Sequence, residues 1–326
     1  MKLAAEIVPN WPPLAWLARG RAGSDEIQLL HGQGVEIGEN WFAEAVWDGP
    51  FEDGGFDQTD LVYGSGGRLR DDCWTFVSSS TTMDRLQYTC DRQRWMVSNS
   101  FVCLMAAMNA GVSSLDSSHR RDFVSIIRGL DRYERQLRTT GGDVRLVYYN
   151  NLTVQNGQPT EIPKPTSSRD VSTYAGYREF LEGGLVRCAE NMRSPQRMRP
   201  YEWLGTISTG FDSPTVVALA RIAGLREVIT FARARDDLDD DGSKIAERLD
   251  LSIHVLNRDA WQNDPLTEVP FLASDAKGED VYFAGAEPLL QQRVLLTGYA
   301  AGAWAAKGRE NSVLRRADQS GLSLTE

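Results

Sequence analysis

The sequence predicts two domains. These are an α+β domain over residues 1–165 and an α/β domain with a doubly wound parallel sheet over residues 166–326. Three observations predict this organisation. The chain has 326 residues, about twice the length of a typical domain. Short strand-like segments dominate the first half. Strands and helices alternate in the second half, which is typical of a parallel sheet with right-handed crossovers.

Composition and charge narrow the classes of protein. Hydrophobic residues make up 41% of the chain and charged residues 25%, which excludes a largely disordered protein. The formal net charge is −10, so we expect neither nucleic acid nor a membrane as a partner. No apolar run is long enough for a transmembrane helix, and Glu6, Pro9 and Pro12 interrupt the start as a signal peptide. The four cysteines form no C-x-x-C pair, which favours mostly buried free thiols and a cytoplasmic location.

In the first half, β-branched and aromatic residues predict strands at residues 60–63, 74–80, 86–89, 94–100 and 144–149. Gly64–Gly67 is expected to be a tight turn between strands, because the Gly-Lys-Ser/Thr of a Walker loop does not follow it. We expect a buried helix at residues 100–109, stopped by Gly111, and a charged helix at residues 120–137. Residues 150–169 hold three prolines and many turn residues, which predicts a linker with the domain boundary near residue 165.

In the second half, strands are expected at residues 203–207, 227–231, 252–256 and 293–297, and helices at residues 174–191, 214–223 and 243–249. Pro214 begins the second helix and Gly224 follows it, the usual asymmetry of helix ends. Ser243 or Asp241 is expected to cap the third helix. Residues 236–242 are expected to form a solvated acidic loop, and three arginines are expected to pair with acids or reach a phosphate: Arg193, Arg197 and Arg199.

The segment Ile207–Ser213, with the sequence ISTGFDS, points most directly to chemistry because it joins a strand to a helix. Gly210 allows a ligand to approach the backbone, and the start of a helix offers unpaired N–H groups. Hydroxyl groups come from Ser208, Thr209 and Ser213. These features predict an anion site of phosphate size, and Asp212 fits it if Mg²⁺ bridges the carboxylate to phosphate oxygens. The alternative is an ordinary strand–helix turn with Ser213 as the N-cap.

Residues 208–213, Ser-Thr-Gly-Phe-Asp-Ser, resemble the Ser-Gly-Gly-x-Asp-Ser pyrophosphate loop (PP-loop) of the N-type ATP pyrophosphatases. The context is similar to the asparagine synthetase branch, which includes β-lactam synthetases and lasso-peptide cyclases. The resemblance implies an adenine nucleotide alpha hydrolase-like fold. It also implies an ATP-dependent, AMP-forming amide ligase that adenylates an unidentified carboxylate for an amine, with ATP and Mg²⁺ as cofactors. The alternative is a non-catalytic nucleotide-binding or interaction module of the same fold; a PP-loop sulfurtransferase or tRNA-modifying enzyme ranks last.

The resemblance also implies roles for individual residues. Pyrophosphate and Mg²⁺ would be held by Ser208, Gly210, Asp212 and Ser213, with Thr209 in place of the family's first glycine and Asp212 as the metal ligand. Adenine and ribose would be flanked by Ile207, Phe231, Thr297 and Gly298, since Leu295–Gly298 looks like the family's second nucleotide loop. The family carries an acidic Mg²⁺ ligand after those glycines, whereas Gly298–Trp304 holds no acid.

The first half is similar, more weakly, to a glutamine amidotransferase-like domain, through the runs around Asp84-Arg85-Leu86 and Val97-Ser98-Asn99. Glutamine hydrolysis in that class uses a Cys nucleophile at the mature N-terminus. Here the second residue is Lys2 and no Cys precedes Cys73, so we expect no glutaminase activity. The family continues into a helical region with a catalytic Lys. The second domain is therefore expected either to be truncated at its C-terminus or to lack that reaction half, and no catalytic residue is assigned.

Overall fold

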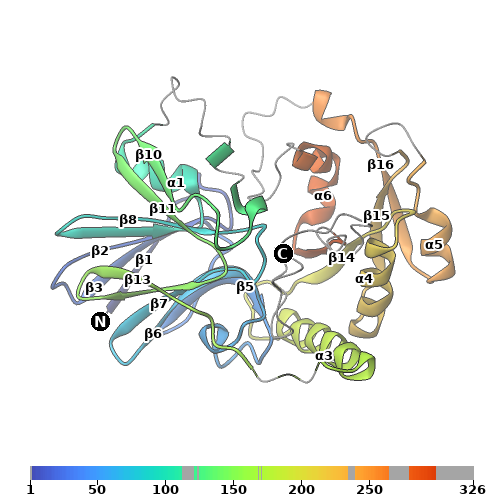
Figure 1. Ribbon diagram of the computed structural model, residues 1–326, viewed down its shortest axis with the longest axis horizontal. Helices are drawn as coiled ribbons and strands as arrows, with labels where there is room; N and C mark the ends of the chain where they lie inside the picture. The colour runs from blue at the N-terminus through green and yellow to red at the C-terminus, as the bar shows by residue number, and fades with distance from the viewer. Residues whose placement is uncertain are drawn as a thin grey trace. The chain divides into compact units, whose positions relative to one another are not determined.

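The chain forms two compact units, Met1–Ser167 and Ser168–Glu326 (Figure 1). The structure, a computed structural model, describes residues 2–111, 121–122, 125–167, 169, 171–233, 239–263 and 279–298. Strands in the first unit pair mostly antiparallel, and the second unit is built on a parallel sheet. Within the described ranges, no helix has the length and apolar character needed to cross a membrane.

Two sheets make up the first unit. Sheet A has seven strands in the order β1 (Lys2–Ile7), β3 (Glu26–His31), β2 (Trp16–Arg21), β9 (Arg94–Ser98), β8 (Leu86–Cys90), β11 (Gly142–Val147) and β10 (Gln136–Thr139). Sheet B has six, in the order β13 (Gln158–Ile162), β12 (Asn151–Gln155), β7 (Cys73–Val77), β6 (Val62–Arg70), β5 (Trp41–Trp47) and β4 (Glu36–Ile37). The pairing is antiparallel except between β1 and β3, which are parallel.

The main core lies between the two sheets. Trp16 and Ala18 alternate along β2 with Leu17, which faces the other side of sheet A, so Trp16 and Ala18 point to the same face. They join one buried cluster with residues of sheet B such as Phe42 and Phe76. The Trp16 and Phe76 rings stack with centroids 6.0 Å apart and an interplanar angle of 17°. The sheets therefore pack face to face as a sandwich.

Helix α1 (Phe101–Met108) covers the other face of sheet A, where Leu104 packs with Leu17 and Val144. Its N-cap is Ser100, whose hydroxyl accepts a hydrogen bond from the Cys103 N–H at 3.2 Å. The helix ends at Asn109, a left-handed residue, two positions before the glycine expected to stop it.

The turn expected at Gly64–Gly67 is wrong, because these residues lie inside β6. A Cβ on Gly66 would overlap the carbonyl oxygen of Phe42 and lie 3.0 Å from the Cα of Ala43 on β5. A Cβ on Gly67 would lie 2.6 Å from the ring of Phe42. The glycines are therefore explained by close approach of a neighbouring strand and an aromatic core residue, not by a turn.

The linker expected over residues 150–169 begins only after a β-hairpin, formed by β12 and β13. Its turn is Asn156-Gly157, with φ angles of 51° and 76°, the left-handed pair that a type I′ turn requires. Leu152 and Val154 of β12 belong to the core between the sheets. Pro159 is tolerated on β13 because that strand is the edge of sheet B.

Of the helix expected over residues 120–137, the described residues 121–122 are helical, but the expectation is wrong from residue 125 onward. Residues Ser125–Arg128 form a 3-10 helix, and Gln136–Thr139 form the strand β10. Leu137 is buried opposite Val144 of β11, while its neighbours along β10 are exposed or half-buried. This alternation has the period of a strand, which the many charged residues obscured.

The second unit is built on sheet C, whose parallel strands run in the order β16 (Ser252–Leu256), β15 (Glu227–Phe231), β14 (Glu202–Thr206) and β17 (Arg293–Leu296). Chain order therefore proceeds from β14 to one side and then returns to β17 on its other side. The expected parallel sheet is confirmed, and each expected strand lies within one residue of an observed one. Helices α4 (Asp212–Ala220) and α5 (Ser243–Arg248) follow β14 and β15, and the short α6 (Glu287–Leu290) precedes β17.

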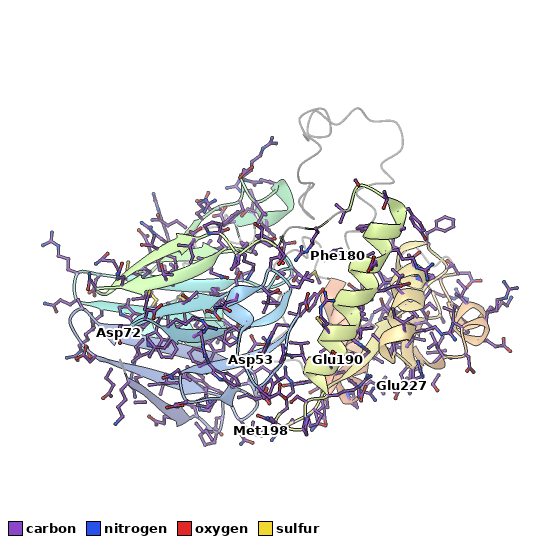
Figure 2. All side chains as sticks on the ribbon, turned by 90° about the horizontal axis from the view of Figure 1, so that it is seen from below. Asp53, Asp72, Phe180, Glu190, Met198 and Glu227 are labelled. Atoms are coloured by element: carbon purple, nitrogen blue, oxygen red, sulfur yellow. The ribbon has the colours of Figure 1, made fainter. Side chains whose placement is uncertain are left out.

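Helix α3 (Tyr174–Met192) precedes the sheet and matches the first helix expected in the second half. Thr173 is its N-cap, and the Thr173 hydroxyl accepts a hydrogen bond from the Gly176 N–H at 3.1 Å. Figure 2 shows Phe180 and Glu190 along this helix and Met198 in the segment that follows it. The segment returns the chain to β14, at the centre of the site described next.

Candidate functional site

Two loops meet at the carboxyl ends of β14 and β17. The first, residues 207–211, leads from β14 into α4, and the second begins with Thr297 and Gly298 after β17. Because β14 and β17 are parallel neighbours, both loops leave the sheet at the same edge. A Cβ on Gly298 would lie only 2.7 Å from the carbonyl carbon of Asp212 and 2.8 Å from the Cα of Ser213. Gly298 therefore lies directly against the first turn of α4, where only glycine fits.

The first loop changes from buried to exposed within a few residues. Ile207 is 2% exposed, and its N–H donates to the carbonyl oxygen of Ile229 at 2.9 Å, which extends the pairing with β15. The next residues come into solvent, and Phe211 is 91% exposed at the N-cap position of α4. Ser213 is the second residue of the helix, so the alternative in which Ser213 is the N-cap is wrong. Its hydroxyl lies 3.1 Å from the hydroxyl of Ser208.

The start of α4 presents backbone donors. The first helical hydrogen bond runs from the Thr215 N–H to the Phe211 carbonyl oxygen at 3.2 Å, and Pro214 has no N–H. Across the ranges that the structure describes, the N–H groups of Phe211, Asp212 and Ser213 donate to no protein acceptor. Unpaired N–H groups at a helix start, together with the helix dipole, favour an anion. The loop can therefore hold a phosphate-sized group.

A part of the acidic loop contacts the first loop. One carboxylate oxygen of Asp240, Oδ1, accepts hydrogen bonds from the Thr209 N–H at 3.2 Å and the Thr209 hydroxyl at 3.1 Å. Residues 234–238, which include the start of the acidic loop, lie outside the described residues. Sequence reasoning missed the role of Asp240, because nothing in the run of acids shows which one reaches the loop.

Asp241 and Gly242 connect this contact to α5. Gly242 is the N-cap, so the expectation that Ser243 or Asp241 takes that position is wrong. The Asp241 carboxylate nevertheless accepts hydrogen bonds from the Ser243 hydroxyl and, at 2.9 Å, from the Ser243 N–H. These two hydrogen bonds lower the pKa of the Asp241 carboxyl. The acid therefore satisfies a donor at the start of α5, one position earlier than a cap.

The structure brings several of the expected site residues together. The two loops gather Ser208, Asp212, Ser213 and Gly298. Phe231 ends β15, and its ring packs edge-on against Phe283 with centroids 5.4 Å apart. The part of Gly298–Trp304 beyond Gly298, where the family carries an acid, lies outside the described residues.

Directly after the first loop, the carboxylate of Asp212 is exposed at the start of α4, where a metal ion could contact it. Throughout the described part of the chain, no group of three or more His, Cys, Asp or Glu side chains could hold a metal ion. Mg²⁺ prefers six oxygen ligands and keeps several waters. The residues present therefore fit Mg²⁺ that arrives with phosphate oxygens, but not a metal held by the protein alone.

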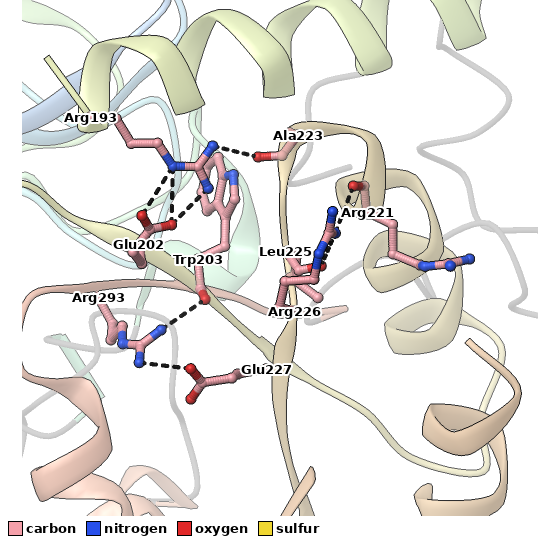
Figure 3. Close-up of polar contacts among 9 residues, drawn as sticks. All are labelled: Arg193, Glu202, Trp203, Arg221, Ala223, Leu225, Arg226, Glu227 and Arg293. Atoms are coloured by element: carbon pink, nitrogen blue, oxygen red, sulfur yellow. Dashed lines mark hydrogen bonds and ion pairs between the residues drawn. The ribbon is translucent and has the colours of Figure 1, made fainter. Parts of the chain in front are cut away.

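At the amino ends of the strands of sheet C, the charged side chains form ion pairs (Figure 3). Arg193 pairs with Glu202 at 2.7 Å, and Arg293 pairs with Glu227 at 3.1 Å. Burial alone would raise the pKa of Glu227, but the hydrogen bond from Arg293 and a weaker one from His254 lower it. Of the two uses expected for Arg193, the structure shows pairing with an acid.

The first unit holds a second polar group, which sequence reasoning missed. Glu44 points inward from β5, and its Oε1 accepts hydrogen bonds from the Ser65 hydroxyl at 2.5 Å and the Asn99 amide at 3.2 Å. Burial raises the pKa of Glu44 to about 8, with a smaller contribution from the nearby charge of Asp84. The signal was in the sequence, since Glu44 shares the inward register with Phe42 on β5.

The cysteines differ in how far they are buried. Cys73 begins β7 half-buried, and burial raises the pKa of its thiol, which disfavours the reactive thiolate. All four cysteines are free, as expected, but Cys90 is exposed, so the expectation of mostly buried thiols holds only for Cys103 and Cys188.

Comparison with known proteins assigns no family: no family model matches the chain, and no curated protein matches it.

Proposed function

We propose that the second unit binds Mg²⁺-ATP at the two loops, and that the protein is an ATP-dependent, AMP-forming ligase that activates a carboxylate for attack by an amine. The observation that supports this most is the contact of Gly298 with the first turn of α4. It joins both loops at the point where the strand order of sheet C reverses, between β14 and β17. Open parallel sheets bind their ligands at this point.

The first loop has the chemistry that a phosphate chain needs. The hydroxyls of Ser208 and Ser213 lie 3.1 Å apart, close enough for both to contact one phosphate group. The N–H groups of residues 211–213, which donate to no acceptor among the described residues, lie beside them at the positive end of α4. Fixed N–H dipoles stabilise the charge that develops on departing pyrophosphate without reorganising. In the proposed reaction, these donors would stabilise the leaving pyrophosphate.

Asp212 would hold Mg²⁺ in this proposal, because its carboxylate stands at the start of α4 beside the phosphate donors. The ion, when bound, neutralises phosphate charge. Ile207 directly follows β14 and Phe231 ends the adjacent β15, and they would flank the adenine and ribose together with Thr297 and Gly298. In this proposal Asp212 holds the metal ion, and the residues at the carboxyl ends of the strands contact the nucleoside.

A non-catalytic nucleotide-binding module is the second candidate. The observation in its favour is that Gly298–Trp304 contains no acid, so Asp212 is the sole carboxylate within residues 207–213 and 298–304. A single carboxylate suffices to bind Mg²⁺ with a nucleotide, since phosphate and water supply the other ligands. The two candidates share the binding site and differ in whether AMP forms.

Calorimetry with Mg²⁺-ATP tests the shared site. We expect the wild type to bind at millimolar nucleotide or below, and Asp212→Asn to bind about tenfold more weakly, since a charged contact contributes about 1.5 kcal/mol. The matched control is Asp250→Asn, which removes the same charge from an exposed residue with a φ of 55° that Asn adopts readily. No heat from the wild type, or equal affinity in wild type and Asp212→Asn, would refute the site. AMP release with a panel of carboxylates then separates ligase from binding module.

A further inference from the structure

We propose that Asp240 is an internal anion that occupies part of the phosphate site, so that nucleotide binds only after residues 239–242 release the first loop. The inference rests on the proposed function, because it concerns the regulation of the same site. Its starting point is the paired contact of one Asp240 oxygen with the backbone and side-chain donors of Thr209.

The contact uses donors that a phosphate would use. Asp240 Oδ1 accepts from the Thr209 N–H at 3.2 Å and from the Thr209 hydroxyl at 3.1 Å. The Thr209 N–H belongs to the loop between β14 and α4, one residue before Gly210. A carboxylate oxygen and a phosphate oxygen are both anionic acceptors of such hydrogen bonds. The two groups therefore compete for Thr209.

The position of Asp240 is dictated by the ends of two strands. The Gly242 N–H donates to the hydroxyl of Thr230 at 3.1 Å, and Thr230 is 2% exposed near the end of β15. A Cβ on Gly242 would lie 3.0 Å from the carbonyl oxygen of Ile207, so the segment runs directly along the first loop. On the other side of Asp240, Asp239 forms an isolated antiparallel β-bridge with Arg233 through the backbone. Asp240 is thus held at the loop from both sides.

Electrostatics makes the contact selective as well as competitive. Asp240 and Asp212 place two carboxylates at the same loop, within reach of any entering anion. Both carboxylates repel an anion unless a cation lies between them. A bare anion is therefore opposed both by the occupied donors and by the charge, whereas a Mg²⁺-bound phosphate chain is opposed less.

The fraction of molecules in which Asp240 contacts Thr209 determines how much the apparent affinity for an anion falls. If the contact closes the site in about nine molecules out of ten, the apparent affinity for a competing anion is about tenfold below the affinity of the open loop. Removing the Asp240 charge should recover this factor. The gain should be larger for inorganic pyrophosphate without Mg²⁺ than for Mg²⁺-ATP.

The test is calorimetry of the full chain with two probes, Mg²⁺-free inorganic pyrophosphate and Mg²⁺-ATP. We expect Asp240→Asn and Asp240→Ala to bind pyrophosphate about tenfold more tightly than the wild type. Asp239→Asn is the matched control: it removes the same charge one residue away and keeps the oxygen that accepts from the Asp241 N–H at 3.2 Å. It should change the affinity less than twofold.

Each other outcome overturns the inference. Unchanged affinity in both Asp240 variants would show that the contact does not compete with the anion, while leaving the proposed function intact. Weaker binding by the variants would make Asp240 a ligand-holding residue instead. An equal gain in Asp239→Asn would reduce the effect to general charge. Failure of the wild type and all variants to bind either probe would refute the proposed function together with the inference.

Discussion

Replacing Lys164 by Met should change how the stability of the first unit depends on pH. Lys164 follows β13 and is 3% exposed. Its ammonium donates to the carbonyl oxygen of Ser78 at 2.6 Å and to the side-chain oxygen of Asn151 at 2.9 Å. Burial lowers the pKa of Lys164 from its ordinary value of 10.5 to about 7, although the charge of Asp60 opposes this shift.

The sign and size of the effect follow from proton binding. Between pH 7 and 10.5 the unfolded chain keeps the Lys164 proton, whereas the folded protein releases it. The free energy of unfolding therefore rises with pH in this window, by about 1.4 kcal/mol per pH unit. From pH 7 to 9.5 the contribution of Lys164 amounts to roughly 3 kcal/mol. Lys164→Met removes this contribution.

Urea unfolding at pH 6, 7, 8 and 9.5, followed by tryptophan fluorescence, measures the difference. Six of the nine tryptophans belong to residues 1–167, so the signal reports mainly on the first unit. We expect the stability advantage of wild type over Lys164→Met to grow by roughly 3 kcal/mol between pH 7 and 9.5. Lys2→Met, at an exposed lysine of β1, is the control and should show a constant difference. A constant difference for Lys164→Met as well would refute the reasoning, because it would mean that the buried amine keeps its charge.

Two further changes test the first unit. Because the pKa of Glu44 is raised, the wild type should lose stability as pH rises from 4.5 to about 8. Glu44→Gln, which still accepts a hydrogen bond from Ser65, should not lose stability in this way. Parallel urea-unfolding profiles of the two proteins over this pH range would contradict the raised pKa. Gly66→Ala should destabilise the protein by about 3 kcal/mol, because the added Cβ would overlap β5. Gly55→Ala is the control and should be neutral, since no atom lies within 4 Å of the added Cβ. Equal melting temperatures for the two variants would contradict the close approach of β5 to Gly66.

The parallel sheet was predictable because its strands are short buried runs bounded by turn residues. Residues 227–231 and 252–256 were predicted with the bounds that the structure shows. Strands of this kind are continuous hydrophobic runs that can be recognised within a few residues of sequence. Their alternation with helices limits the number of possible sheet topologies. The PP-loop resemblance likewise rests on consecutive residues, so the expected site could be placed between β14 and α4.

The sandwich was less predictable, because its pairing is long-range. No strand was expected before residue 60, although β1 to β5 lie there and β1 pairs in parallel with β3. Glycine at Gly66 has a different meaning in a turn and beside another strand, and only the tertiary structure distinguishes the two. The prolines after Gly157 led to the prediction of a linker, although the dipeptide Asn156-Gly157 is typical of a hairpin turn. Asp240 reaches Thr209 through tertiary structure, which no local pattern encodes.

The outer strands of the sandwich carry features that oppose pairing with strands from other copies of the chain. An open strand edge exposes N–H and C=O groups that can add strands from another chain, which is how aggregation begins. Sheet B ends on one side in β13, which carries Pro159 and Glu161, and on the other in β4, which is only two residues long. Sheet A begins at β1, where Lys2 is exposed on the strand. Missing donors, short length and charge each discourage a further strand, so these edges resist growth into fibrils.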